Sequence, residues 1–284
     1  MTAASLQTKL KGLLEGLGQP ALHYAVSTTR WPEAMKRCFL ELEPDAALCE
    51  FLASIPATRA TRGRTWLQRS LRWVMSDYDA NALLDMYPMH LLSTRQAERL
   101  LMRRSRSGTL LDIGAGNGDV TAALAPLFER VCTVEASRWA RRRLSGRGFG
   151  IDTYDATQEG IRGGPYDVIA LLNVLDRTAR PLTLLDRLYR GMSDTSLLLL
   201  SVPLPYRPHS YRGPMSREPE ERLPIVGNHF SDALLRLVQQ VLVPQGFEVV
   251  RMTRLPYLSG GDSDCPMTAL DAAVVLCRKA ARSS

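Results

Sequence analysis

Cysteine is scarce in this 284-residue sequence, and the few cysteines are scattered along it. There are five, an odd number, and no two form a C-x-x-C pair: Cys38, Cys49, Cys132, Cys265 and Cys277. This distribution argues against a disulfide framework and against a structural zinc site. The four histidines are equally dispersed, so we expect no bound metal. The cysteine usage fits a reducing compartment, and we expect an intracellular protein of the cytoplasm.

Long hydrophobic runs are also missing. No stretch approaches the roughly 18 uninterrupted apolar residues that a transmembrane helix needs. The best run, residues 197–202, is interrupted at once by Pro203 and Pro205 and is typical of a buried strand. The first 18 residues carry Lys9, Lys11 and Glu15 among their apolar positions, which a secretory signal would not tolerate. We therefore expect no transmembrane segment and no signal peptide.

Acidic residues are outnumbered, which leaves a formal net charge of +7. Arginines cluster in residues 103–106 and 138–147. A polyanion such as RNA is one partner that this charge would suit. A solvated helix face is the other interpretation, and we favour it because residues 137–148 have helical character and no interleaved platform of aromatic side chains. We do not expect a nucleic-acid partner.

The first third of the chain has the pattern of helices. Leucines recur at helical spacing from Leu6 to Leu14, and further periodic stretches cover residues 31–52, 65–75 and 94–103. The last of these opens with Ser93-x-x-Gln96, a capping box. We expect residues 1–104 to be helical throughout and to form a cap on the domain that follows.

From Thr109 onward the pattern alternates between strands and helices. Apolar runs at residues 109–113, 131–134, 148–153, 167–172 and 196–202 predict five strands, and residues 181–192 and 231–243 predict helices. Residues 248–253 and 271–277 share a helix-free connection, so we expect an antiparallel pair at the sheet edge. This layout predicts an α/β fold with the seven-strand, Rossmann-like sheet of class I methyltransferases in residues 105–284, preceded by an N-terminal helical extension.

A glycine-rich turn follows the first of these strands, in LLDIGAGNGDV. Gly114 and Gly116 would let the backbone approach a ligand that a Cβ would exclude. Dinucleotide enzymes use G-x-G-x-x-G, but this chain has Asp119 at the last position, where an acid would repel a pyrophosphate. S-adenosylmethionine has no phosphate and carries two positive groups, which Asp112 and Asp119 suit. The alternative is a helix cap with no ligand.

An acidic residue, Glu135, ends the second strand about 20 residues beyond the turn. A carboxylate at this separation reaches the ribose hydroxyls of an adenosine and accepts two hydrogen bonds. The alternative is an ordinary strand-end acid on the surface. Together with the glycine turn, Glu135 predicts adenosine binding.

Two polar residues follow the fourth strand in LLNVLDR. Asn173 lies at the carboxyl end of a central strand, where open α/β sheets place ligands, and Asp176 comes three residues later. The Asn/Asp-Pro-Pro-aromatic turn of many nucleic-acid amino-methyltransferases is absent here. Either residue is equally able to cap the next helix, and Asp176 to pair with Arg177.

Two long connections leave the carboxyl ends of strands, where loops of this length often form lids or substrate walls. Residues 203–227 are rich in proline, arginine and aromatics, Tyr206 among them. Residues 256–269 carry Tyr257, which we expect to overhang the site. The alternative for Tyr257 is a tyrosine of the core.

Several strings together are similar to a known family. LLDIGAGNGDVT, VCTVEAS, YDVIALLNVLDRTARPLTLL, TRLPYL and LDAAV resemble the DREV family, methyltransferase-like protein 9. Members of that family are protein-L-histidine N-pros-methyltransferases, which modify His-x-His sequences in protein substrates. The resemblance implies that Glu135, Asn173 and Tyr257 contact the cofactor and that Asp176 is the acid beside the target imidazole.

One departure concerns the substrate. Family members carry paired tyrosines shortly before the final LD, and this chain has Met267 and Thr268 there. Thr268 keeps a hydroxyl without the aromatic face, so the His-x-His preference is expected to be relaxed or altered. We place Tyr206 and Thr268 with Asp176 among the substrate-binding residues.

The resemblance implies transfer of a methyl group from S-adenosylmethionine to a substrate histidine. An acid that accepts the tele N–H would fix the imidazole tautomer and leave the pros nitrogen as the nucleophile. We assign this catalytic role to Asp176, with Asn173 beside the cofactor. Two alternatives remain: a methyltransferase of a small molecule or RNA, and a cofactor-binding partner protein without catalysis.

Overall fold

The computed structural model describes residues 3–212, 215–262 and 264–281. Its α-helices are α1 (Ala3–Gly16), α2 (Glu33–Cys38), α3 (Ala46–Thr58), α4 (Arg62–Leu71), α5 (Asp77–Leu84), α6 (Thr94–Leu101), α7 (Asp119–Leu124), α8 (Arg138–Gly146), α9 (Ala156–Glu159), α10 (Pro181–Gly191) and α11 (Phe230–Arg236). A 3-10 turn, Ala125–Leu127, continues α7, and a π-helix, Leu237–Leu242, continues α11.

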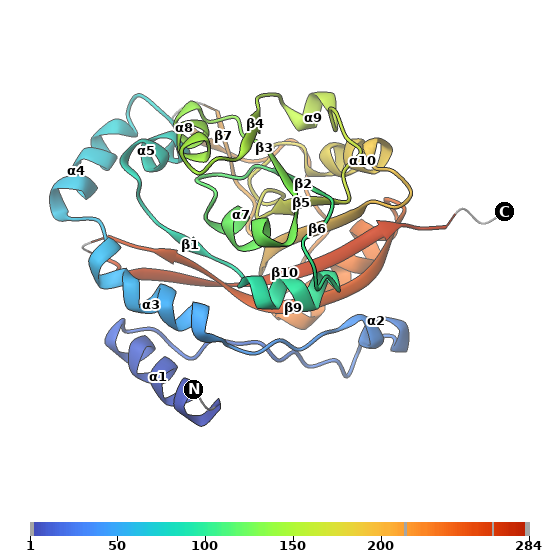
Figure 1. Ribbon diagram of the computed structural model, residues 1–284, viewed down its shortest axis with the longest axis horizontal. Coiled ribbons are helices and arrows are strands. Elements are labelled where there is room, and N and C mark those ends of the chain that lie inside the picture. The colour runs from blue at the N-terminus through green and yellow to red at the C-terminus, as the bar shows by residue number, and fades with distance from the viewer. Residues whose placement is uncertain (1–2, 213–214, 263, 282–284) are drawn as a thin grey trace.

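The strands are β1 (Met89–His90), β2 (Thr109–Ile113), β3 (Arg130–Val134), β4 (Gly150–Asp152), β5 (Val168–Leu172), β6 (Leu197–Leu204), β7 (Ser210–Arg212), β8 (Met215–Arg217), β9 (Phe247–Gly260) and β10 (Met267–Lys279). The main sheet has the order β1-β9-β10-β6-β5-β2-β3-β4, and β7 and β8 form a separate pair (Figure 1). From β6 to β4 neighbouring strands are parallel, whereas β10 is antiparallel to β6 and to β9.

This is the expected class I methyltransferase architecture, an α/β fold with a Rossmann-like sheet, but the sheet has eight strands rather than seven. The additional strand is β1, which pairs antiparallel with β9 through Met89 opposite Ser259 and His90 opposite Leu258. Two residues are too few to show an alternating pattern, so only the tertiary pairing reveals this strand.

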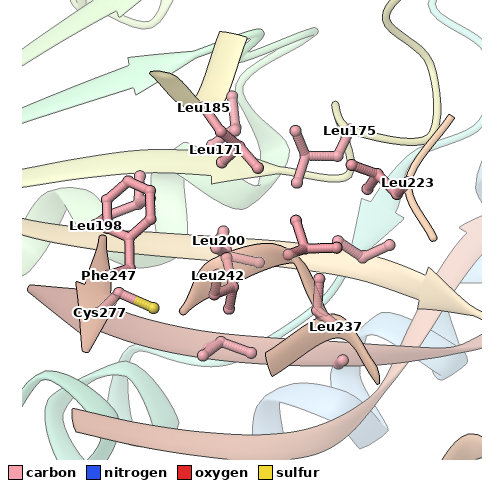
Figure 2. Close-up of a cluster of buried hydrophobic side chains, with 14 of the residues drawn as sticks. Leu171, Leu175, Leu185, Leu198, Leu200, Leu223, Leu237, Leu242, Phe247 and Cys277 are labelled. Atoms are coloured by element: carbon pink, nitrogen blue, oxygen red, sulfur yellow. The ribbon is translucent and has the colours of Figure 1, made fainter. Parts of the chain in front are cut away.

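Helices pack on both faces of the sheet. Strand residues that alternate along β5 belong to two separate hydrophobic clusters, Ile169 and Leu171 to one and Val168 and Ala170 to the other. The first cluster lies under α10, α11 and the π-helix (Figure 2). The second lies under α1, α3, α6 and α7. Coverage of both faces explains why β5 is apolar at every position.

The N-terminal third is not helical throughout, contrary to the sequence expectation. Residues 19–28 and 40–45 are extended or irregular, and Phe39 makes a parallel bridge with Met252 of β9. These segments run along the β9 side of the sheet in Figure 1. The leucines of α1 and α3 pack into the same cluster as the sheet, so their burial comes from the main sheet rather than from a separate core.

The last two strands extend further than the sequence indicated. The expected connection of residues 256–269 shortens to residues 261–266, because β9 continues to Gly260 and β10 begins at Met267. Tyr257 therefore lies within β9 and not on a loop, opposite Leu270. Pro256 is tolerated because it lies on the part of β9 that β1 does not cover.

No helix in the described part of the chain has both the length and the apolar character to cross a membrane. Within the same residues, no group of three or more histidine, cysteine, aspartate or glutamate side chains is arranged to hold a metal ion.

Candidate active site

The strand order reverses direction beside β2. The chain runs from β2 outward through β3 to β4, then returns to place β5 on the other side of β2. Ligands of open α/β sheets bind at such a switch point, beyond the carboxyl ends of the strands. A cavity of about 800 Å³ lies here, bordered by Gly114 after β2 and Asn173 after β5.

Four parts of the chain line the cavity. They are the segment around α5 (Ser76, Asp77, Tyr78, Asp79, Asn81, Ala82, Met86, Tyr87, Met89), the turns after β2 and β3 (Gly114, Gly116, Asn117, Glu135, Ala136, Ser137, Ala140), the segment after β5 (Leu172, Asn173, Val174, Arg177, Thr178) and the β9–β10 hairpin (Tyr257, Ser259, Gly260, Gly261, Asp262, Cys265, Thr268, Leu270).

The glycine turn brings bare backbone to the cavity. Gly114 has φ +75°, and a Cβ built there would lie 2.6 Å from Val174 Cγ2. Gly116 has φ +57°, and its Cβ would meet only Met89 Cε, at 3.7 Å. Glycine adopts such positive φ values without strain. The space beside Gly116 is therefore open to a ligand that approaches the backbone closely.

Glu135 is fixed by the backbone of two turns. The N–H of Gly116 donates to Oε2 and the N–H of Ser137 donates to Oε1, each over 2.8 Å. Burial raises the pKa of Glu135, and these amide bonds oppose that effect. Each carboxylate oxygen has two acceptor sites, so both oxygens are still able to accept a ribose hydroxyl.

The two aspartates that flank the glycine turn do not line the cavity. Asp112 is buried behind the turn, where its Oδ2 accepts the Thr121 hydroxyl over 2.6 Å. Asp119 accepts the backbone N–H of Met89 over 3.1 Å and pairs with Arg147. Both acids were expected to have an electrostatic role toward the cofactor, but Asp119 instead attaches β1 and the end of α8 to the turn.

Asn173 is held in an unusual backbone conformation. Its φ is +55°, in the left-handed region that asparagine tolerates better than most residues. The Ser201 hydroxyl donates to Asn173 Oδ1 over 2.8 Å, which turns the amide N–H₂ away from Ser201. A hydrogen bond between Asn173 and Tyr257 lowers the pKa of the Tyr257 hydroxyl, although burial, the largest effect, raises that pKa overall.

Tyr257 does not overhang the cavity from a loop, because it lies within β9. It is buried in the cluster beneath α1, α3 and α6, and it also lines the cavity. Its hydroxyl contacts Met89 Sδ at 2.9 Å, which links β9 to the segment before α6.

Asp176 is buried beside the cavity with half of its carboxylate unused. Oδ2 lies 3.4 Å from Arg177 Nε, while Oδ1 has no hydrogen-bond partner within the described residues. Burial raises the pKa of Asp176, and the Arg177 charge opposes the rise. Asp176 itself is outside the cavity lining, but Val174 and Arg177 on either side of it are part of that lining.

The proposed substrate residues fall in different places. Thr268 of β10 lines the cavity. Tyr206 does not, because its hydroxyl donates to the Leu175 carbonyl over 3.2 Å and its ring packs on the hydrophobic cluster beneath α10. Met267 is buried and also outside the lining.

The cavity wall made by α5 and the residues beside it could not be predicted from the sequence. Ser137 donates to Asp79 Oδ1 over 2.5 Å, and Arg177 Nη1 donates to the Tyr78 hydroxyl over 3.3 Å. The Tyr78 hydroxyl is also 3.4 Å from His209 Nε2. The one local signal was Ser76-x-x-Asp79, which caps α5. The contacts of Tyr78 and Asp79 with Ser137, Arg177 and His209 join residues that are 58 to 131 positions apart in the sequence, so they leave no local pattern.

These features fit S-adenosylmethionine. An open glycine backbone, a fixed acceptor pair on Glu135 and an amide on Asn173 suit an adenosine and an amino acid. The lining also carries Asp77, Asp79 and Asp262, a negative environment that suits a sulfonium and an ammonium and disfavours phosphates.

The profile of the DREV methyltransferase family matches residues 23–279. The chain belongs to the DREV methyltransferase family. Its methyl donor is S-adenosylmethionine, in agreement with the cavity chemistry.

Solved structures resemble this DREV chain more distantly. One solved structure is described by the words "Conversion of a Disulfide Bond into a Thioacetal Group during Echinomycin Biosynthesis". It is 15% identical, with 68% of this chain and 83% of that chain covered and a TM-score of 0.46. The [4+2]-cyclase SpnF is 14% identical, with 66% of this chain and 81% of that chain covered and a TM-score of 0.45. The N-methyltransferase NodS from Bradyrhizobium japonicum WM9, in complex with S-adenosyl-L-homocysteine, is 15% identical, with 65% of this chain and 86% of that chain covered and a TM-score of 0.40. Similarity at this level says nothing about the substrate.

Proposed function

We propose that this DREV methyltransferase is a protein-histidine N-pros-methyltransferase, which modifies His-x-His type sequences in protein substrates. The observation that carries the proposal is the unused Oδ1 of Asp176, a buried acceptor with no donor among the described residues. A buried carboxylate oxygen without a donor is costly, so its position next to a cavity suggests that a ligand N–H completes it.

We propose that Gly114, Gly116 and Glu135 hold the adenosine part of the cofactor, and that Asn173 and Tyr257 border its amino-acid part. The glycines and Glu135 occupy the turns after β2 and β3, whereas Asn173 follows β5 and Tyr257 lies on β9. Asp112 supports the turn from behind through Thr121. The bound cofactor supplies an electrophilic methyl group on a sulfonium.

The acceptor chemistry follows from the imidazole ring. A neutral imidazole has one N–H and one bare nitrogen, and only the bare nitrogen is a nucleophile. If Asp176 Oδ1 accepts the tele N–H, the pros lone pair points away from the acid. That lone pair forms the new N–C bond, the sulfur keeps the electrons of the S–C bond, and the ring then releases its tele proton.

Asp176 acts here as a charged acceptor. Ionised Asp176 stabilises the positive charge that develops on the ring during transfer. Arg177 helps to keep the acid ionised despite its burial. The Arg177 guanidinium is itself held by the Tyr78 hydroxyl, so α5 contributes indirectly to the acceptor side of the cavity. We propose residues 1–104 as the cap that supplies this wall and residues 105–284 as the catalytic domain.

The acidic lining supports a histidine acceptor over a nucleic acid. Asp77, Asp79, Glu135 and Asp262 all border the cavity, and their charges repel a polyanion. Thr268 is the residue we propose to contact the substrate beyond the imidazole. Met267 has no ring and is buried, and Tyr206 lies outside the cavity lining with its hydroxyl bonded to the Leu175 carbonyl, so neither position supplies an aromatic face to the cavity. We therefore expect a relaxed His-x-His preference.

The test is incubation of the full chain with labelled cofactor and a His-x-His peptide, followed by mass spectrometry to locate the methyl group. We expect label on a histidine, and none on a matched peptide with both histidines replaced by alanine. Label on the alanine control, or cofactor turnover only with a small molecule or RNA, would contradict the proposal.

A further inference from the structure

Helix α4 has its amphipathic pattern reversed. The side chains that face the protein are polar, since Thr65 and Gln68 are buried with 3% and 4% of their surface exposed. The side chains that face solvent are large and apolar: Trp66 and Leu67 on the helix, then Trp73 and Val74 directly after it, with 71%, 41%, 86% and 73% exposed. A helix that packs on a protein core normally shows the opposite arrangement.

The reversed orientation is fixed by specific hydrogen bonds. Gln68 Nε2 donates to Asp77 Oδ1 over 2.8 Å and to Asn81 Oδ1 over 3.0 Å. Arg64 reaches across to donate to the Asp85 carbonyl over 3.0 Å. The polar face of α4 is thus anchored on α5, and turning the tryptophans inward would break these bonds.

The four apolar side chains are close together in the chain. Trp66 and Leu67 are on α4, and Trp73 and Val74 lie in the turn that follows the end of the helix at Leu71. None of the four lines the cavity, so they are not part of the cofactor site. We call Trp66, Leu67, Trp73 and Val74 the α4 stripe.

The chain segment that carries the stripe has charged side chains of one sign only. Residues 51–76 contain five arginines (Arg59, Arg62, Arg64, Arg69 and Arg72) and no aspartate or glutamate. Acids from neighbouring segments neutralise two of them, because Arg69 pairs with Asp264 and Arg72 with Asp77. Positive charge therefore remains in excess beside the exposed tryptophans.

We propose that the α4 stripe docks this protein on the surface of an anionic lipid bilayer. A short helix with tryptophan and leucine on one face and arginines around it lies in the plane of the membrane interface. Tryptophan favours the headgroup level, and each arginine near an anionic leaflet adds electrostatic attraction. The helix lies on the surface and does not span the bilayer, in keeping with its length of 10 residues.

A second copy of this chain fits the stripe poorly. Self-association through α4 would bring two arginine-rich segments of the same sign together. Four side chains, two on α4 and two just after it, also bury far less than the roughly 800 Å² per partner that a stable dimer needs. Charge complementarity favours the anionic surface.

The docking would bring the methyltransferase cavity close to lipid. Helix α4 is bonded to Asp77 and Asn81, and both of these residues line the cavity. The wall that α5 forms is therefore coupled to the membrane-binding helix, whatever the methyl acceptor is.

The test is flotation of the full chain with phosphatidylcholine vesicles and with mixed phosphatidylcholine–phosphatidylserine vesicles. We expect binding to the mixed vesicles, its loss at high salt, and a fall of about tenfold or more in the double variant W66S/W73S. The matched control is V226S/V243S, which removes two exposed apolar side chains outside the α4 stripe and should bind normally. Circular dichroism and the melting temperature check that each variant is folded.

Several outcomes would overturn the proposal. No flotation of wild-type protein with anionic vesicles does so, as does equal binding to both vesicle types or unchanged binding of W66S/W73S. A shift from dimer to monomer in W66S/W73S without vesicles would assign the stripe to a second copy. If W66S/W73S no longer methylates protein in vesicle-free solution but still binds vesicles, the α4 stripe would be assigned to a protein partner instead. A blue shift of Trp66 or Trp73 fluorescence on adding mixed vesicles would support the proposal.

Discussion

At the scale of single residues, Glu135 shows how the backbone orients a carboxylate that we propose to bind the cofactor. Its two oxygens are each fixed by one amide before any ligand arrives, one from the glycine turn and one from the turn after β3. Pre-orientation of this kind lowers the entropy lost on binding. The position of Glu135 after β3 and in the cavity lining could be predicted from the sequence, because a strand end about 20 residues after a glycine turn is a local signal.

Glu135→Ala should weaken cofactor binding by about 1.5–3 kcal/mol, since both acceptor oxygens are lost. Isothermal calorimetry with S-adenosylmethionine or its demethylated product measures the effect. The control is Glu129→Ala, an exposed acid just before the same strand, which should leave the affinity unchanged. Equal affinity of the Glu135 variant and wild type would remove Glu135 from the cofactor site.

Asp112 illustrates a residue whose structural setting the sequence did not reveal. The pattern gave it a cofactor role, whereas its carboxylate is buried against Thr121 and outside the cavity lining. Burial raises the pKa of Asp112 to about 6. Burial of this kind depends on packing from several elements, which no local pattern records.

This pKa predicts a pH dependence of stability. An unfolded aspartate titrates near 3.9. Between about pH 3.9 and about pH 6 Asp112 is protonated in the folded protein and ionised in the unfolded chain. Its contribution to the free energy of unfolding therefore falls as the pH rises through this range. Asp112→Asn should remove this pH-dependent loss, so that between pH 4 and pH 7 its free energy of unfolding rises by about 2–3 kcal/mol relative to that of the wild type. Denaturant titrations without cofactor measure it; a variant with the same pH profile as wild type would contradict the burial argument. Asp186→Asn, at a partly exposed acid, is the control.

Asp176 should affect turnover and not cofactor affinity. With Asp176→Ala we expect near-normal cofactor binding and a fall in kcat of about a hundredfold or more, the usual scale for a positioned acid–base partner. Asp176→Asn should also be poor, because an amide lacks the charge that favours the imidazolium.

The wild-type rate should fall as the pH is lowered, since both the substrate imidazole and Asp176, whose pKa burial raises, then become protonated. Full activity in Asp176→Ala, or a rate that does not fall at low pH, would remove Asp176 from this role.

At the scale of elements, the sequence was most informative where the structure is local. The strand runs at β2, β3 and β5 and the capping box before α6 were all predicted, because strand apolarity and capping depend on neighbouring residues. The full length of β9 was not predicted from the sequence, because Pro256 is a strand-breaking signal. Only the short reach of β1 makes that proline harmless, and this is a tertiary fact.

Tyr257 of β9 is the element-scale test, since core packing and the proposed cofactor contact meet in one side chain. Tyr257→Phe keeps the ring in the core and should leave the melting temperature close to wild type, while the loss of the hydroxyl weakens cofactor binding. Tyr257→Ala removes the ring as well and should destabilise the fold by about 3–5 kcal/mol. Thermal unfolding and calorimetry separate the two effects. Normal affinity in both variants would leave Tyr257 as a core residue only.

At the scale of the whole molecule, the cavity is closed by parts of the chain that are distant in sequence. The turns after β2, β3 and β5 form its base, α5 forms one wall and the β9–β10 hairpin another. The base was predictable, because parallel strands bring their carboxyl ends to one edge. The α5 wall was not, because Tyr78 and Asp79 reach the site only through contacts with Arg177 and Ser137.

The most direct test of the account is the position of the methyl group on the product. A His-x-His peptide methylated by the wild-type chain is hydrolysed, and the amino acids are separated by chromatography that resolves pros-methylhistidine from tele-methylhistidine. If Asp176 Oδ1 accepts the tele N–H, the product is the pros isomer and its formation is lost in Asp176→Ala. A tele-methylated product, or methyl on a residue other than histidine, would contradict the account.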